Sequence, residues 1–147
     1  MNFTGKSVYF SGADTEKLNQ IGRLVAEKLK YKFFDVNLLI ENELSMPVSE
    51  MVSKMDKSYF RVVEHSFIDK LSRDEKVVAV CGPGAMLTEK NFYTAKRNGV
   101  VVYIEDKTGS QNPARLLQKP LYEKHCDIKL EYLKTAEETA NALLKLL

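Results

Sequence analysis

Cysteine is scarce in this sequence of 147 residues, and its two cysteines, Cys81 and Cys126, stand far apart. Neither belongs to a Cys-x-x-Cys pair or to a Cys/His pattern with metal-ligand spacing, which argues against a zinc site and against a disulfide framework. Sparse, unpaired cysteines fit a reduced compartment, so we expect a cytoplasmic protein. No metal site is predicted.

Long apolar runs are also missing, and so is an excess of charge of one sign. No run approaches the roughly 20 apolar residues that a membrane-spanning helix needs, and residues 1–6 lack the apolar core of a signal peptide. The 22 basic and 20 acidic residues are interspersed and leave a formal net charge of only +2. Such a balance gives no strong field, so we expect neither nucleic acid nor a membrane surface as partner, and the oligomeric state stays open.

Short β-rich runs alternate with longer stretches in which apolar residues recur at helical spacing. The expected strands are residues 7–10, 31–34, 77–80, 100–104 and 128–130. The expected helices are residues 18–29, 35–43, 47–55, 58–71, 89–98 and 136–147. This alternation predicts a single domain, residues 1–147, with an α/β/α three-layer fold around a parallel, five-stranded sheet. In such a sheet the ligand crevice lies beyond the carboxyl ends of the strands. Those ends are Ser11-Gly12, Phe34-Asp35, Cys81-Gly82 and Glu105-Asp106.

Four segments near those ends resemble the shikimate kinase family. Residues 22–35 resemble its first helix and second strand, and residues 33–41 resemble its F-x-D-x-D-x-x-I-E motif. Residues 60–64 resemble F-R-x-x-E, and residues 78–87 resemble the strand that runs into G-G-G-A. The resemblance covers nearly the whole chain and implies a P-loop kinase-like fold that transfers phosphate from Mg·ATP to shikimate. The alternative is an unrelated P-loop-like or Rossmann-like domain.

The family's phosphate-binding loop has the pattern G-x-x-x-x-G-K-[ST], in which the Lys contacts the β/γ-phosphates and the Ser/Thr hydroxyl holds Mg²⁺. Counted back without a gap from Gly22, this pattern falls on residues 12–19. Gly12 matches, but Lys17 replaces the second Gly, Leu18 replaces the Lys and Asn19 replaces the Ser/Thr. The resemblance therefore implies a degenerate nucleotide site at Gly12, Lys17 and Asn19.

Two carboxylates, Asp14 and Glu16, stand where phosphate would bind. Asp14 or Thr15 can cap the following helix, and Glu16 suits its first turn, so the helix can satisfy its own N–H groups and its positive end. Lys17 could bend towards a phosphate and recover part of what the loop has lost.

The acceptor side of the site is half preserved. Arg61 stands where the family's Arg binds the shikimate carboxylate, and Glu64 could orient it, although a surface Arg–Glu pair is the alternative. Asp35 matches the first family Asp, near Mg²⁺. Asn37 replaces the second, a sugar-binding residue and candidate base, and an amide cannot take up a proton.

The last two family features are altered as well. Gly82 and Gly84 flank Pro83 in place of three glycines, which removes one backbone N–H donor. Residues 107–119 are expected to form a loop much shorter than the family's lid, within which Arg115 corresponds to a lid Arg.

We expect a shikimate-kinase-like protein that is non-catalytic or severely impaired in phosphoryl transfer and that binds a small carboxylate or polyol. The evidence is the joint replacement of the loop Lys, the loop Ser/Thr, the second Asp and the lid. One alternative is an active, divergent shikimate kinase that uses Mg·ATP through Lys17. The other is an enzyme of another type, or a structural or regulatory subunit on the same fold.

Overall fold

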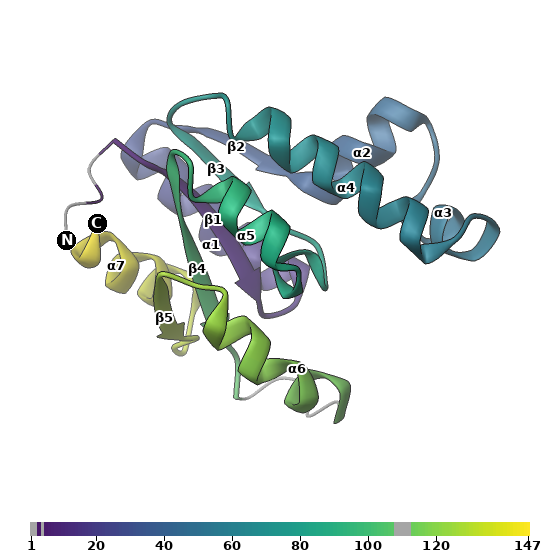
Figure 1. The fold of residues 1–147 in the computed structure, drawn as a ribbon. Helices are drawn as coiled ribbons and strands as arrows, with labels where there is room; N and C mark the ends of the chain where they lie inside the picture. The colour runs from purple at the N-terminus through teal and green to yellow at the C-terminus, as the bar shows by residue number, and fades with distance from the viewer. Residues whose placement is uncertain (1–2, 4, 108–112) are drawn as a thin grey trace.

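A computed structural model describes residues 3, 5–107 and 113–147 of the chain. Five parallel strands form one sheet in the order β2-β3-β1-β4-β5 (Figure 1). They are β1 (Ser7–Gly12), β2 (Lys32–Asp35), β3 (Val77–Val80), β4 (Gly99–Glu105) and β5 (Ile128–Glu131). The predicted five-stranded parallel sheet is confirmed.

Helices cover both faces of this sheet (Figure 1). One face packs against α1 (Thr15–Leu29) and α7 (Ala136–Leu146). The other packs against α2 (Val36–Leu44), α3 (Val48–Lys54), α4 (Lys57–Leu71), the 3-10 turn η1 (Ala85–Leu87), α5 (Glu89–Ala95) and α6 (Pro113–Lys124). The three-layer prediction is therefore confirmed.

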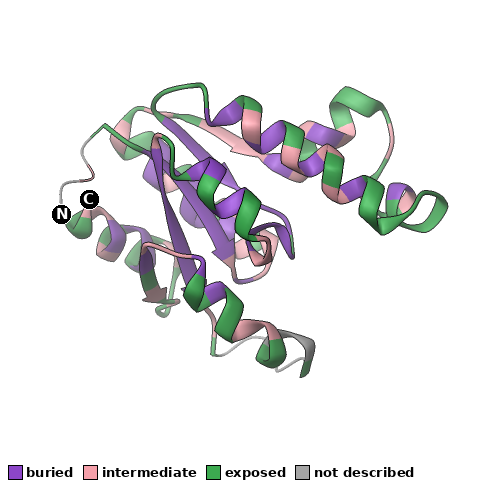
Figure 2. Ribbon diagram, viewed as in Figure 1, coloured by how far each residue is buried: buried purple, intermediate pink, exposed green. Residues whose placement is uncertain are grey.

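The central strand β1 divides its side chains between two apolar clusters, because successive residues of a strand point to opposite faces. Val8 and Phe10 lie in the cluster under α1 and α7, while Tyr9 lies in the cluster on the other face. Figure 2 shows the resulting buried band along β1, β3 and β4. Val77–Val80 is buried throughout, as its unbroken apolar sequence predicts.

Polar side chains fix where most of the helices begin. The residue just before the helix accepts a hydrogen bond from a backbone N–H of the first turn, which satisfies one of the unpaired donors there. The residues that do so are Asp14 for α1, Asp35 for α2, Asp56 for α4, Thr88 for α5 and Thr135 for α7.

One expected loop is partly helical. Residues 113–119, expected to belong to a short lid loop, form the first half of α6, and residues 108–112 lie outside the described residues. Pro113 occupies the start of the helix, where a missing N–H costs nothing. In the sequence, this proline and Gly109 are typical of a loop, which is why the helix is not predicted. Within the described ranges, no helix is both long and apolar enough to cross a bilayer.

Candidate functional site

The parallel pairing brings the carboxyl ends of four strands together. Gly12 at the end of β1 lies opposite Ile104 of β4, and Asp35 at the end of β2 lies opposite Val80 of β3. The residues singled out in the sequence follow these ends or lie on the helices behind them. They therefore lie along the edge of the sheet where a ligand crevice is expected in a parallel sheet.

The first turn of α1 is capped by an acidic side chain of the chain itself. Asp14 Oδ1 accepts a hydrogen bond of 3.0 Å from the backbone N–H of Lys17, so Asp14 rather than Thr15 is the cap. Glu16 lies in the first turn, near the positive end of the helix. Leu18, at the position of the family's loop Lys, is buried in the apolar cluster under α1.

The Lys17 side chain is bound within the chain. Its ammonium forms an ion pair with Asp106, which follows β4 and whose side chain is fully buried. The same ammonium lies 4.8 Å from the centre of the Tyr132 ring. The hydrogen bond to Asp106 raises the pKa of Lys17. This contact ties the start of α1 to the neighbouring strand.

Asn19 and Asp35 are joined directly. Asn19 Nδ2 donates a hydrogen bond of 2.9 Å to Asp35 Oδ2, while Asp35 Oδ1 accepts one of 3.2 Å from the backbone N–H of Leu38. Asp35 therefore both caps α2 and contacts α1. The other amide atom, Asn19 Oδ1, is buried without a protein hydrogen-bond partner.

Asn37 lies against the turn that follows β3. A Cβ atom added at Gly82 would lie 2.3 Å from Asn37 Nδ2, so only glycine permits this approach. Asn37 Oδ1 is likewise buried without a protein partner.

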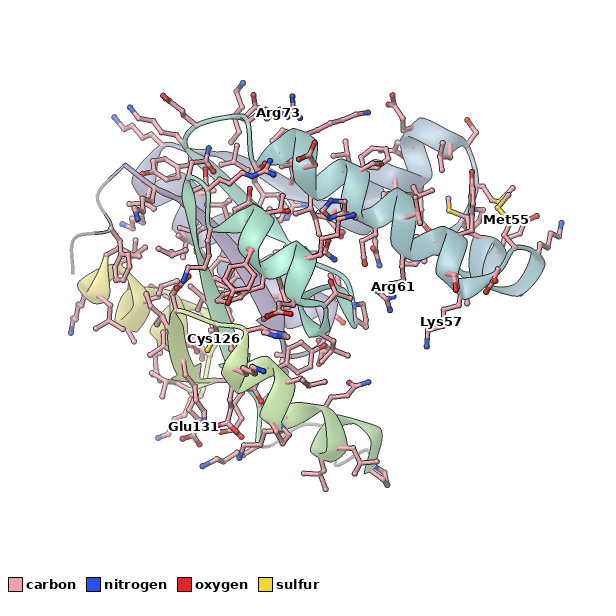
Figure 3. All side chains as sticks on the ribbon, in the orientation of Figure 1. Met55, Lys57, Arg61, Arg73, Cys126 and Glu131 are labelled. Atoms are coloured by element: carbon pink, nitrogen blue, oxygen red, sulfur yellow. The ribbon has the colours of Figure 1, made fainter. Side chains whose placement is uncertain are left out.

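Arg61 reaches the same turn from α4. Its Nη1 donates to Glu64 Oε1 at 2.8 Å, and its Nη2 donates to the carbonyl oxygen of Pro83 at 3.2 Å. Figure 3 shows the side chain projecting from α4 towards the side on which α6 lies. Gly84 has φ +85°, and a Cβ atom there would lie 2.4 Å from Arg61 Nη2.

The Arg61–Glu64 pair is not an exposed surface pair. The Glu64 side chain is fully buried and that of Arg61 is 28% exposed. Burial raises the pKa of Glu64, and the neighbouring guanidinium opposes this rise. Glu64 Oε2 is a third buried acceptor without a protein partner.

Two tyrosines and one aspartate belong to the site although we did not single them out as site residues from the sequence. Tyr122 of α6 accepts a hydrogen bond of 3.1 Å from the backbone N–H of Gly84, and its ring stacks on Tyr103 of β4 at 5.4 Å between centroids. Asp106 binds Lys17. A signal was present for Asp106, which the sequence analysis places at the carboxyl end of a strand.

The remaining candidate, Arg115, belongs to α6, but the structure does not describe its side chain. Asp35, Asn37, Arg61, Gly82 and Gly84 gather around the turn after β3 or the start of α2, whereas Gly12 and Lys17 lie towards β4. Among the described residues, no three His, Cys, Asp or Glu side chains cluster so as to hold a metal ion.

The family model described as "Shikimate kinase" matches residues 19–112, well over half of the chain. The shikimate kinase of Thermodesulfovibrio yellowstonii is 34% identical, and the match covers 85% of each chain. The chain belongs to the shikimate kinase family. The matched range starts at Asn19, so residues 12–18 lie outside it.

Other relatives match over shorter stretches or at lower identity. The shikimate kinase of Alkaliphilus oremlandii is 38% identical over 85 residues, which is 58% of this chain and only half of that relative. The solved shikimate kinase of Aquifex aeolicus shares the fold at a TM-score of 0.84 and 23% identity, with 95% of this chain and 94% of that one covered. The solved shikimate kinase of Acinetobacter baumannii in complex with shikimate gives a TM-score of 0.83 at 22% identity, covering 97% of this chain and 93% of that one.

Proposed function

We propose that this chain is a single-domain, ligand-binding member of the shikimate kinase family that does not transfer phosphate. The observation that carries the proposal is the pair of contacts at the start of α1. Asn19 donates to Asp35, and Lys17 is bound to Asp106. In both contacts, a side chain at a position where the family binds nucleotide or metal is bound instead to another residue of the chain.

The residues present do not fit Mg·ATP. A phosphate at this helix start would meet Asp14, which already accepts the N–H of Lys17. A carboxylate about 5 Å from a phosphate charge costs on the order of 3 kcal/mol at an effective dielectric near 20. For the metal, a family hydroxyl is replaced by the Asn19 amide, whose nitrogen donates to Asp35 and whose oxygen is buried. We therefore propose that the loop at residues 12–19 is degenerate and that binding Mg·ATP there would cost free energy.

The acceptor end of the crevice supports binding of a small carboxylate. The two described hydrogen bonds of Arg61 use two of the five guanidinium N–H groups. The remaining N–H groups can bind a carboxylate, and partial burial makes such a bond stronger than one in bulk water. The fold neighbour from Acinetobacter baumannii is in complex with shikimate, which is itself a small carboxylate.

Family membership favours a second function, that of an active, divergent shikimate kinase using Mg·ATP. That activity would require Lys17 to leave the buried carboxylate of Asp106 and turn to a phosphate. Asp106, whose side chain is fully buried, would then lose its ion pair with Lys17, which is why we favour the binding function.

Phosphoryl transfer can be followed directly by ³¹P NMR with Mg·ATP and shikimate. We expect no shikimate phosphate from this chain, whereas the Thermodesulfovibrio yellowstonii relative serves as positive control. Formation of the phosphate ester at a rate near that of the control would establish the active-kinase function instead.

Carboxylate binding is tested by NMR titration with shikimate, using Arg61→Lys and Arg61→Ala/Glu64→Gln. Both variants avoid leaving Glu64 as a lone buried charge, and both lose the bidentate guanidinium. We expect weak, ATP-independent binding by the parent chain and none by either variant. Equal binding by all three proteins, or no binding by the parent, would remove Arg61 from the site.

A further inference from the structure

Two carboxylates near the carboxyl ends of the strands, Glu64 and Asp35, have different surroundings. Glu64 is paired with the Arg61 guanidinium. Asp35 has a neutral amide, Asn19 Nδ2, and one backbone N–H as its hydrogen-bond partners. In the described part of the chain no lysine, arginine or histidine forms an ion pair with Asp35. Asp35 is therefore a half-buried anion without a cation.

No cation of α1 forms a described ion pair with Asp35. The position of the family's loop Lys is occupied by Leu18, which is buried in the apolar cluster under α1. Lys17 is held by Asp106 on the β4 side. Both features leave the negative charge of Asp35 to be matched by something other than α1.

Two uncharged oxygens near Asp35 also lack protein donors. The nitrogen of the Asn19 amide faces Asp35, so Asn19 Oδ1 must point away from it as an acceptor. Asn37 Oδ1, in the first turn of α2 that Asp35 caps, is buried without a protein partner as well. A buried acceptor left unpaired costs about 1–3 kcal/mol. The surroundings of Asp35 thus contain one half-buried carboxylate and two buried amide oxygens that lack protein donors.

Asn37 and Arg61 contact opposite ends of one short turn. Asn37 lies against Gly82, and Arg61 lies against Gly84. Two Cα steps separate these glycines, so their Cα atoms are at most about 7.6 Å apart. Arg61 and Asn37 thus lie at the two ends of one three-residue turn.

We propose that the crevice binds a small zwitterion, an amino carboxylate whose carboxylate lies at Arg61 and whose ammonium lies at Asp35. The carboxylate end rests on the function proposed above, and the ammonium end is new. A primary ammonium brings one positive charge and three N–H donors. Asp35 would supply the negative charge for it, and Asn19 Oδ1 and Asn37 Oδ1 are the buried acceptors without protein donors that it would pair with.

Three ligands with one ring isolate the ammonium: cyclohexanecarboxylate, cis-3-hydroxycyclohexanecarboxylate and cis-3-aminocyclohexanecarboxylate. Binding is followed in ¹H–¹⁵N NMR spectra through the Gly82 and Gly84 amides and the Asn37 side-chain amide. We expect the amino compound to bind at least about tenfold more tightly than the hydroxy compound, because only it neutralises Asp35.

Asp35→Asn should remove this preference while leaving the hydroxy compound bound, since Asn caps a helix as well as Asp does. Asp56→Asn is the matched control, because Asp56 caps α4 by the same kind of bond and the change in net charge is the same. That control should keep the full preference for the amino compound.

The outcomes separate this inference from the function on which it rests. Equal binding of the three compounds, or tighter binding of the hydroxy compound, would overturn the ammonium site and leave the carboxylate site standing. A preference that survives in Asp35→Asn would overturn it as well. Failure of all three compounds and of shikimate to bind would overturn the carboxylate site, and the zwitterion with it.

Discussion

The Lys17 ammonium and the Asp106 carboxylate form an ion pair between the first turn of α1 and the end of β4. The Asp106 side chain is fully buried and that of Lys17 is 28% exposed. The start of α1, which corresponds to the helix start that faces a nucleotide in a P-loop kinase, is therefore held against the sheet by an ion pair within the chain.

Lys17→Met should destabilise the fold, because it leaves Asp106 buried without this cation. Breaking a buried pair from one side costs about 3 kcal/mol or more. Lys17→Met/Asp106→Asn should recover most of the loss. Lys54→Met is the control, since its pair with Glu50 is exposed and is worth less than about 1 kcal/mol. Urea unfolding of the four proteins measures this, and equal stability of Lys17→Met and Lys54→Met would contradict the prediction.

The Arg61–Glu64 pair gives a prediction of pH dependence. Burial raises the pKa of Glu64, and removal of the guanidinium in Arg61→Met raises it further. A carboxyl group with a raised folded-state pKa favours the folded state only while it is protonated. The free energy of unfolding of Arg61→Met should therefore match the parent best below about pH 4.3. As the pH rises through the Glu64 pKa, the free energy of unfolding of the variant should drop below that of the parent. The difference should reach about 3 kcal/mol near neutrality.

Arg61→Met/Glu64→Gln carries no charge at the pair, so its difference from the parent should be nearly independent of pH. Urea unfolding between pH 4 and 8 tests both variants. If the free energy of unfolding of Arg61→Met lay below that of the parent by the same amount at every pH, burial would not raise the pKa of Glu64 as this prediction requires.

Gly84→Ala should weaken both the fold and carboxylate binding. The positive φ alone costs about 1–2 kcal/mol for an L-residue. The added Cβ would also displace Arg61 Nη2. Gly5→Ala is a matched control, because Gly5 has φ +80° and nothing lies within 4 Å of its Cβ position. Both variants should lose similar stability, but only Gly84→Ala should lose the NMR response to shikimate. Retained binding in Gly84→Ala would show that Arg61 is free to move.

How far the sequence predicts this molecule depends on how local the signal is. The apolar run 77–80 is a strand buried on both faces, and Asp14 caps a helix, because each signal lies within a few residues. α6 was missed because Pro113 favours both a loop and a helix start. Asn19 and Asp35 are 16 positions apart, and Lys17 and Asp106 are 89 apart. The sequence places these residues at one edge of the sheet, but their pairing depends on side-chain directions that no motif specifies.

Rebuilding the phosphate loop tests whether its replacements are the cause of lost nucleotide binding. The variant carries Asp14→Gly, Glu16→Gly, Lys17→Gly, Leu18→Lys and Asn19→Ser, with Asp106→Asn because Lys17 no longer pairs with that buried carboxylate. Leu18 lies in the core, so the variant should be less stable than the parent, and Mg·ATP should raise its melting temperature.

Turnover should stay low in this variant, because the amide of Asn37 cannot accept a proton, and should rise on adding Asn37→Asp. Phosphorylation of shikimate at the rate of an active relative with Asn37 still in place would show that the loop alone had been limiting.

Titration calorimetry of the unmodified chain with Mg·ATP bears most directly on the proposal that the helix start serves the fold and not a nucleotide. With Asp14 capping α1, Lys17 bound to Asp106 and Asn19 bound to Asp35, we expect a dissociation constant no better than about 1 mM, or some −4 kcal/mol. A micromolar dissociation constant would contradict the account, because these three contacts would then have to yield to the nucleotide at little cost.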